Sequence, residues 1–174
     1  MTESTMDRDA ILVRYAKGPS VLREALEGLT DAGLDAAPDA ENWTIRQIAH
    51  HIVDGDHLWA IGIKAALGDC DAAFGFPWYW AMPQKQWGER WGYAACDLGP
   101  SLALFEASRA QILQMLQAMP DAWDRSLVVQ WPGREPERVT VGGIVEGQAG
   151  HAMGHVSDIL KIRRLSANNA NLHE

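Results

Sequence analysis

The feature that most constrains the fold is a helical spacing of apolar residues, which recurs in four segments of the chain. Apolar residues three and four positions apart predict an amphipathic helix in each segment. We expect helices at about residues 6–29, 45–67, 101–119 and 141–165. Residues 126–141, SLVVQWPGREPERVTV, are the only stretch with β character, and we expect a short strand or hairpin there at most. Four long helices and almost no strand predict an all-α fold, a four-helix bundle.

Local signals mark the helix ends and the connections. Thr44 and Gln47 have the spacing of a capping box, and Thr140 is the expected cap of the last helix. Gly18-Pro19 interrupts the first segment, which predicts a kink or a break. Residues 70–97 are rich in aromatic residues, glycine and proline but show no sustained period. We expect a long ordered loop there, with one short helical turn at most, and loops of this length in small domains are usually functional.

Length, charge and cysteine content limit the classes of protein to consider. A chain of 174 residues suits one domain, with a core at about residues 6–166 and a disordered tail at residues 167–174. The net charge of −8 argues against a nucleic-acid partner, because phosphate binding needs a basic surface. There is no run of roughly 18 apolar residues that could span a membrane, and no secretion signal. Cys70 and Cys96 lack metal-type spacing, so we expect reduced thiols and a cytoplasmic protein.

Two consecutive histidines, His50 and His51, lie in the second predicted helix and face different directions. The apolar arc of this helix is centred near Ile52. At about 100° per residue, His51 lies at the edge of the arc, whereas His50 points roughly 160° away. We therefore predict that His51 faces inward and that His50 is solvated. Taken alone, His51 also fits a boundary histidine that bonds to a backbone carbonyl.

A second histidine pair, His151 and His155, lies four residues apart on one face of the last predicted helix. This spacing lets two imidazoles bind one cation, as in HExxH zinc sites. With His51 as a third ligand the site is half open, which is typical of catalytic metal sites. Gln148 and Asp158 lie about one turn on either side and are candidates to orient imidazole N–H groups. The alternative is a coincidence of unrelated polar residues.

Two further features leave alternatives open. Asp56 falls near the middle of the apolar arc, where an unpaired carboxylate is costly, so it either lines a cavity or pairs with a buried donor. Four glycines form a stripe beside the histidines of the last helix: Gly143, Gly147, Gly150 and Gly154. Each weakens a helix by roughly 0.5–1 kcal/mol relative to alanine. Such glycines are tolerable if another backbone approaches closely or if a cavity is needed, and we expect close approach, such as by a partner subunit, rather than flexibility.

The segments NWTIRQIAHHIVDGDH and GHAMGHVSDI resemble the two motifs of the DinB/YfiT-like superfamily, and the chain is most similar to its YfiT branch. The first motif is a tryptophan, a Ser/Thr cap and a histidine, matched by Trp43, Thr44 and His51. The second motif, HxxxHxx(Q/E/D)(I/L), is matched by His151, His155, Asp158 and Ile159. The likeness covers about residues 10–165.

This resemblance implies an up-down-down-up bundle, often dimeric, with a divalent metal bound by His51, His151 and His155. Some members of the superfamily transfer a low-molecular-weight thiol such as bacillithiol to an electrophile, and related members isomerise maleylpyruvate with a thiol cofactor. Others have been called metal-dependent hydrolases. Residues 152–154, AMG, replace the extra histidines that YfiT-type proteins have between the two ligands, so we do not expect a proton relay there.

From these patterns we predict a divalent-metal-dependent enzyme, a thiol S-transferase in which the metal lowers the pKa of a small thiol. Zinc or nickel is the expected metal, and imidazole ligands also suit copper and iron. The expected partners are a small-molecule substrate and a second copy of the chain. Aromatic residues of the long connection would contact the substrate: Trp78, Tyr79, Trp80, Trp87 and Trp91. Their alternative role is an apolar plug at the open end of the bundle.

Two other functions remain open. A hydrolase would use the same metal to activate water and needs a nearby carboxylate as base, for which Asp54, Asp56 and Asp158 are candidates. A non-catalytic stress-response or small-molecule-binding module, whose metal is structural or vestigial, is the alternative of a different class.

Overall fold

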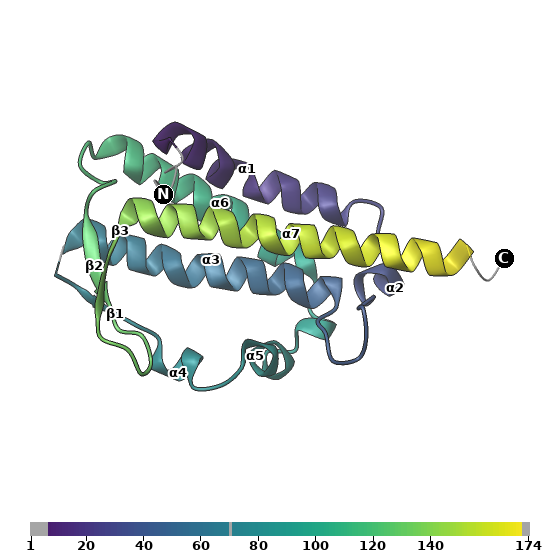
Figure 1. The fold of residues 1–174 in the computed structure, drawn as a ribbon. Coiled ribbons are helices and arrows are strands. Elements are labelled where there is room, and N and C mark those ends of the chain that lie inside the picture. Colours follow the sequence, from purple (N-terminus) through teal and green to yellow (C-terminus); the bar gives the residue numbers. More distant parts are fainter. Residues whose placement is uncertain (1–6, 70, 172–174) are drawn as a thin grey trace, which may run out of the picture.

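Four long helices form the bundle in the computed structural model, which describes residues 7–69 and 71–171 (Figure 1). They are α1 (Arg8–Leu26), α3 (Ile45–Gly68), α6 (Leu98–Ala118) and α7 (Val141–Asn171). Helices α1 and α7 run in one direction and α3 and α6 in the other, so the predicted up-down-down-up four-helix bundle is confirmed (Figure 1). Helix α7 includes residues 167–171, where we expected a tail, and residues 172–174 lie outside the described residues.

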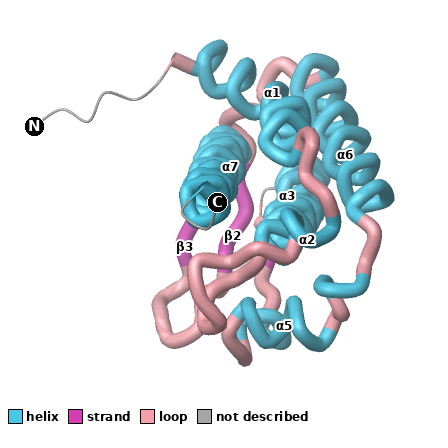
Figure 2. The backbone as a smooth tube through the Cα atoms, turned by 90° about the vertical axis from the view of Figure 1, so that its right-hand side faces the viewer, coloured by secondary structure: helices cyan, strands magenta, loops and turns pink. Residues whose placement is uncertain are grey.

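The connections contain more regular structure than the sequence pattern indicated. A short helix, α2 (Asp31–Leu34), follows α1. Between α3 and α6 lie β1 (Ala73–Phe74), α4 (Pro77–Trp80), α5 (Gln84–Arg90) and the 3-10 helix η1 (Tyr93–Ala95). The prediction of a loop with one helical turn is therefore wrong, because helices of 4 and 7 residues are too short to show a period. This connecting segment passes along the bundle, with α5 below α3 and α7 in Figure 2.

A small sheet lies at the end of the bundle where α3 and α6 finish (Figure 1). The predicted hairpin is confirmed, with β2 (Ser126–Val129) antiparallel to β3 (Glu137–Thr140). Strand β1 adds a parallel edge, with Ala73 opposite Val128. The sequence did not predict β1, because two residues show no alternation and the strand exists only where β2 provides its partner.

The predicted caps of the two histidine-bearing helices are present. Thr44 Oγ1 accepts from the Gln47 N–H at 3.2 Å, and Gln47 Oε1 accepts from the Thr44 N–H at 2.9 Å, which completes the capping box of α3. Thr140 Oγ1 accepts from the Gly143 N–H at 3.0 Å in the first turn of α7. Local sequence signals therefore define where both helices begin.

We predicted a kink or a break at Gly18-Pro19. Helix α1 continues through both residues, so the break is absent. Pro19 has no N–H to donate to the carbonyl of Tyr15, four residues earlier. That carbonyl instead accepts from Arg109 Nη1 of α6 at 2.6 Å. A Cβ on Gly18 would overlap the same guanidinium group. The Gly-Pro pair thus provides both space and an acceptor for a side chain of another helix.

Arg109 connects all four long helices through buried polar contacts. Its Nε and Nη2 donate to Asp56 Oδ1 on α3 at 2.9 and 2.7 Å, and Nη2 also donates to the Gln148 carbonyl on α7 at 3.0 Å. The side chains of Arg109 and Asp56 are 2% and 1% exposed. Asp56 therefore pairs with a buried donor. Apolar clusters around Ile52 and Ile63 form the core on either side of this pair.

No helix in the described parts of the chain has the length and apolar character that a membrane span requires. Cys96 is exposed with a free thiol, and Cys70 lies outside the described residues.

Candidate metal centre

Three histidine side chains from two helices meet between α3 and α7. His51 belongs to α3, and His151 and His155 lie about one turn apart on α7. His51 Nε2 and His151 Nε2 are 3.2 Å apart, and one ligand atom of each of the three residues lies within 4.8 Å of the others. In the part of the chain that the structure describes, this is the only such group of three or more His, Cys, Asp or Glu side chains. The three predicted ligands are thus brought together.

The spacing of the two Nε2 atoms fits a shared metal ion. Imidazole nitrogens lie about 2.0–2.1 Å from zinc, and a tetrahedral angle then separates two of them by about 3.3 Å. The distance of 3.2 Å between His51 and His151 matches this separation. Three protein ligands leave a fourth position for another molecule. The residues therefore fit a divalent metal, and their role as ligands stays a prediction.

The three rings are neutral at physiological pH, as metal binding requires. Burial, with smaller contributions from His151 and His155, lowers the pKa of His51 to about 3. Burial, followed by the effects of His155 and Arg109, lowers the pKa of His151 to about 4. Burial also lowers the pKa of His155, an effect that the Asp158 carboxylate opposes. Each ring therefore has a nitrogen lone pair available for a cation.

Trp43 and Gly55 shape the space around the histidines. The Trp43 ring meets His51 edge to face, with 4.4 Å between the ring centroids. A Cβ on Gly55, one turn after His51, would lie 3.2 Å from His151 Cε1. Gly55 therefore provides room for the ring of His151 between the helices. Sequence reasoning missed this role, although a glycine four residues after a predicted ligand was the available signal.

Asp158 and Gln148, both predicted to orient the imidazoles, differ in their contacts. Asp158 Oδ2 is 3.6 Å from His155 Nδ1, and its Oδ1 accepts from Lys161 Nζ at 2.9 Å. This position suits the predicted role of Asp158. Gln148 Oε1 is buried without a hydrogen-bond partner, so the predicted contact with an imidazole N–H is not present.

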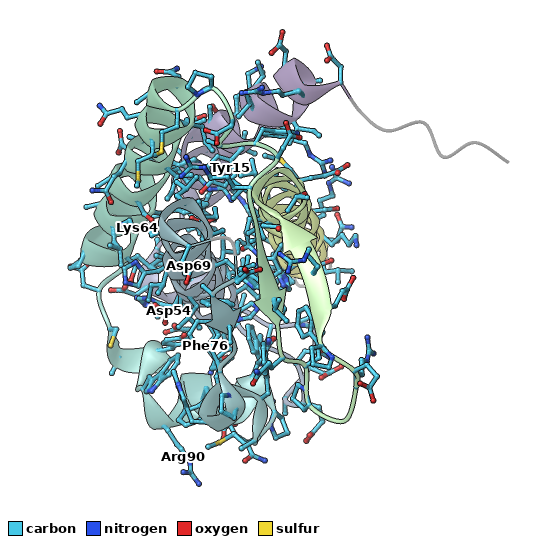
Figure 3. The ribbon with its side chains drawn as sticks, turned by 90° about the vertical axis from the view of Figure 1, so that its left-hand side faces the viewer. Tyr15, Asp54, Lys64, Asp69, Phe76 and Arg90 are labelled. Carbon is cyan, nitrogen blue, oxygen red and sulfur yellow. The ribbon has the colours of Figure 1, made fainter. Side chains whose placement is uncertain are left out.

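Two cavities adjoin the histidine cluster. One of about 170 Å³ is lined by His51, His151 and Gln148, and one of about 560 Å³ is lined by His155 and Asp158. Aromatic side chains of α3, the connecting segment and the hairpin also line the smaller cavity: Trp59, Phe76, Tyr79, Trp80 and Trp131. Figure 3 shows Phe76 below α3, well separated from Tyr15 in the upper part of the bundle.

Two of the five aromatic residues predicted to contact substrate, Tyr79 and Trp80, line the smaller cavity. The other three do not line it. Trp87 packs against Trp78 and Trp91, with 5.4 and 5.3 Å between the ring centroids. Its Nε1 donates to the Tyr79 carbonyl at 2.7 Å. Trp78, Trp87 and Trp91 therefore form a separate aromatic cluster that holds Tyr79 in place.

Three of the aromatic residues that line the smaller cavity were not predicted as site residues: Trp59, Phe76 and Trp131. Trp59 belonged to the apolar arc of the second predicted helix, and Trp131 lies in the hairpin connection, distant in sequence from every predicted ligand. Their rings are 5.7 Å apart between centroids. Neither residue carries a local signal that distinguishes a cavity wall from ordinary core packing.

His50 is buried, with 3% exposure, so the prediction of a solvated side chain is wrong. Its Nε2 donates to the Cys96 carbonyl at 3.4 Å and its Nδ1 accepts from the Ser101 hydroxyl at 2.9 Å. Its ring stacks on Tyr93 with 5.0 Å between centroids. Burial lowers the pKa of His50. The connecting segment and the start of α6 cover this face of α3, which helical phase alone does not reveal.

The candidate bases for a hydrolase are mostly engaged elsewhere. Asp54 accepts a hydrogen bond from the Tyr93 hydroxyl and lines a separate hollow with His50 (Asp54 is labelled in Figure 3). Asp56 is held by Arg109. No carboxylate lines the smaller cavity among the described residues. Asp158 is thus the one predicted base that lies beside a candidate ligand.

The glycine stripe of α7 faces open space over most of its length. A Cβ built on Gly147, Gly150 or Gly154 would have nothing within 4 Å among the described residues beyond its own helix turns. Gly143 lies beside Thr140 and Val139 at the start of the helix. The expected approach of another backbone therefore does not come from this chain, and approach by a partner subunit stays a prediction.

Comparisons with known proteins agree with this architecture. The family model of the DinB superfamily matches residues 14–159. The chain is 29% identical over 103 residues to "Putative metal-dependent hydrolase YfiT" of Bacillus subtilis, covering 59% of this chain and 55% of that protein. The chain thus matches about half the length of this relative. It is 24% identical over 149 residues to a protein of the same description from Oceanobacillus iheyensis, covering 82% and 80% of the two chains.

A solved structure has the same fold. It is described as "YfiT from Bacillus subtilis is a probable metal-dependent hydrolase with an unusual four-helix bundle topology". The TM-score is 0.79 at 22% identity, over 96% of this chain and 93% of that chain. Because the family model covers most of the sequence, including all three clustered histidines, the chain belongs to the DinB superfamily.

Proposed function

We propose that this chain is a divalent-metal-dependent transferase that joins a small thiol to an electrophile. The observation that carries the proposal is the position of three neutral histidines between two cavities, which offers one space for each reactant. The larger cavity, of about 560 Å³, has the size of a typical small-molecule site and suits the thiol. The smaller, aromatic cavity suits an apolar part of the electrophile.

The residues of the chain would bind and orient the reacting groups. His51, His151 and His155 would hold a metal whose charge lowers the pKa of a coordinated thiol. Asp158, beside His155 Nδ1, would fix the tautomer that leaves Nε2 free to act as a ligand. In the transfer, the sulfur forms a bond to the electrophilic carbon, the leaving group departs with its bonding electrons, and the thiol proton passes to solvent.

Hydrolysis is the second candidate, and the names of the relatives favour it. A hydrolase needs a base for the attacking water. Asp158 is near His155 and lines the larger cavity, so it is the residue that would take this role. The transferase is preferred because a metal-activated thiol needs no carboxylate base, and none lines the smaller cavity among the described residues.

Metal binding is the first test. Isothermal titration of the metal-free chain with zinc, nickel and other divalent ions should give one site per chain. His51→Ala should abolish this binding, whereas His57→Ala, which removes an exposed histidine of the same helix, should leave it unchanged. Equal affinity in the wild-type and His51→Ala proteins would exclude the proposed site.

Activity is the second test. The metal-loaded chain should accelerate the reaction of a small thiol with chlorodinitrobenzene and should not hydrolyse nitrophenyl esters. Adding the thiol to cobalt-substituted protein should produce a thiolate charge-transfer band, and no band at saturating thiol would contradict the transferase. Ester hydrolysis that depends on Asp158 would support the hydrolase instead. Metal binding without turnover in either assay would favour a non-catalytic binding module.

A further inference from the structure

We infer that Ser101 is a nucleophilic serine, activated by His50, which accepts an acyl group from an uncharged or cationic ester bound in a second site of the chain. The site is the hollow of about 410 Å³ that both residues line. This hollow shares no lining residue with the two cavities beside the histidine cluster. The inference therefore goes beyond the proposed function and does not depend on it.

The hydrogen bonds of His50 determine which of its ring nitrogens faces the serine with a lone pair. His50 Nε2 lies 3.4 Å from the Cys96 carbonyl oxygen, which can only accept, so Nε2 carries the proton of the neutral ring. Nδ1 then has the lone pair, and it lies 2.9 Å from Ser101 Oγ, whose hydroxyl donates to it. A serine nucleophile and its base are typically about 2.6–3.2 Å apart, so this pair has the required geometry.

His50 is held by groups that do not react themselves. The residue is 3% exposed, and its ring stacks on Tyr93 with 5.0 Å between the centroids and 23° between the ring planes. The Tyr93 hydroxyl in turn donates to Asp54. Ser101 lies near the start of α6 and His50 lies in α3, so the packing of the bundle assembles the pair. The base therefore has the fixed orientation that a nucleophile–base pair needs.

The lining of the hollow indicates the class of electrophile. Ser101 is half-buried and lines the hollow, so a ligand can reach its Oγ. Trp91 and Tyr93 provide aromatic surface for an apolar part of the ligand. Asp54 and Asp97 add negative charge, and no Lys or Arg lines the hollow among the described residues. Like-charge repulsion therefore disfavours anions such as phosphate esters, and an uncharged or cationic acyl group is favoured.

The inferred step is a single acylation. Ser101 Oγ forms a bond to the carbonyl carbon of the ester, and the bond from that carbon to the leaving oxygen breaks. The hydroxyl proton passes to His50 Nδ1 and then to the leaving oxygen, which departs as an alcohol. The products are acylated Ser101 and the free alcohol, and the step is not a hydrolytic turnover of the ester.

Sulfonyl fluorides test this reactivity, because they react at the same oxygen with fluoride as the leaving group and give a stable adduct. The full-length chain is treated with cationic aminoethylbenzenesulfonyl fluoride, and modified peptides are quantified over time by mass spectrometry. Ser108 is the internal reference, since it lies two turns later on α6, is also half-buried and lines another hollow. Ser101 should react about 100-fold faster than Ser108, because general-base assistance contributes about 10²–10⁴-fold. Equal rates would overturn the inference.

Variants separate activation by His50 from simple accessibility. Ser101→Ala should remove the fast modification, and Ser108→Ala should leave it unchanged. His50→Gln should slow the modification of Ser101 about 100-fold, with folding checked by circular dichroism. Fast modification that persists in Ser101→Ala or in folded His50→Gln would overturn the inference. If His50→Gln does not fold, the comparison of Ser101 with Ser108 in the wild-type chain still decides.

The charge of the electrophile is tested with fluorosulfonylbenzoate, an anion of similar size. With the rate at Ser108 as the measure of each reagent's intrinsic reactivity, the cation should modify Ser101 about tenfold faster than the anion. An equal or faster reaction with the anion would overturn the assigned class of electrophile.

Discussion

Two adjacent histidines of α3 have separate environments, although one helical turn contains both. His51 meets His151 and His155, with 5.0 Å between ring centroids in each pair, whereas His50 stacks on Tyr93 and bonds to Ser101. Successive side chains on a helix diverge by about 100°, so one helix can contribute to two unrelated clusters. The geometry therefore distinguishes the candidate ligand from its neighbour.

Gly55 provides the sharpest test of the packing around the histidines. Gly55→Ala adds a methyl group 3.2 Å from His151 Cε1, which should displace that ring. We expect metal affinity to fall by about 10–100-fold, the size of effect seen when residues that orient ligands are changed. Calorimetric titration measures it. The control is Gly147→Ala, where a Cβ has free space and stability should rise by roughly 0.5–1 kcal/mol. Unchanged metal affinity in Gly55→Ala would contradict this role.

The lowered pKa values of the histidines predict how the stability of the metal-free chain depends on pH. His51 and His151 have an ordinary pKa of 6.5 when unfolded, against pKa values of about 3 and about 4 when folded. Between these values the unfolded chain binds more protons, so stability is highest above pH 6.5 and falls as the pH decreases toward 4. Urea unfolding at pH 7.5 and at pH 5 should measure this loss.

A matched variant isolates the contribution of these two rings. His51→Gln combined with His151→Gln removes both titrating groups, so the difference in stability between the two pH values should become smaller. An equal loss in the wild-type and doubly substituted chains would show that other groups control the pH dependence.

At the scale of whole elements, one buried arginine links the four long helices. Arg109 donates to the carbonyl of Tyr15 on α1, to Asp56 on α3 and to the carbonyl of Gln148 on α7. The aromatic rings of Tyr15 and Phe105 lie 4.1 and 4.4 Å from the guanidinium carbon. The same contacts fix the part of α7 just before His151, so they also position the candidate site.

Removing this arginine should be strongly destabilising. Arg109→Met leaves Asp56 without its counter-charge, and breaking a buried ion pair in this way costs about 3–5 kcal/mol. The double variant Asp56→Leu/Arg109→Met should cost less than Arg109→Met alone, because no unpaired charge remains. Urea denaturation gives both values. As a control, Arg23→Met breaks the exposed pair with Glu106 and should cost at most about 1 kcal/mol. Additive losses in the double variant would contradict the pairing argument.

At the scale of the whole molecule, metal binding should stabilise the entire bundle. The candidate ligands come from α3 and α7, so an ion that they share is bound only when these helices are packed together. At a free metal concentration of 100 times Kd, the stabilisation is about 2.7 kcal/mol. For a domain of this size that corresponds to a rise in Tm of about 5–10 °C. Thermal denaturation followed by circular dichroism measures this rise in Tm. Adding a chelator should reverse the rise.

His155→Ala is the control for this experiment. Adding metal should not raise the Tm of this variant, because the substitution removes one of the three candidate ligands and only two imidazoles remain. A metal-dependent rise in Tm of the same size in His155→Ala would place the metal elsewhere on the chain.

Local patterns in the sequence determined much of the fold. The period of apolar residues located the four long helices, and the capping box placed the start of α3 at Thr44. The spacing of His151 and His155, with the helical phase of His51, identified three side chains that the structure brings together. These features depend on residues a few positions apart, whose relative directions are set by the helix itself.

Tertiary structure alone decided which environment surrounds each helix face. The sequence could not show that the connecting segment buries His50, that Pro19 leaves a carbonyl for Arg109, or that Trp131 forms a cavity wall with Trp59. Each of these contacts joins residues distant along the chain, and no local period encodes which distant segment covers a given face. Sequence therefore determined the helices and the candidate ligands, whereas packing decided the cavities, because a cavity is formed by residues from several elements at once.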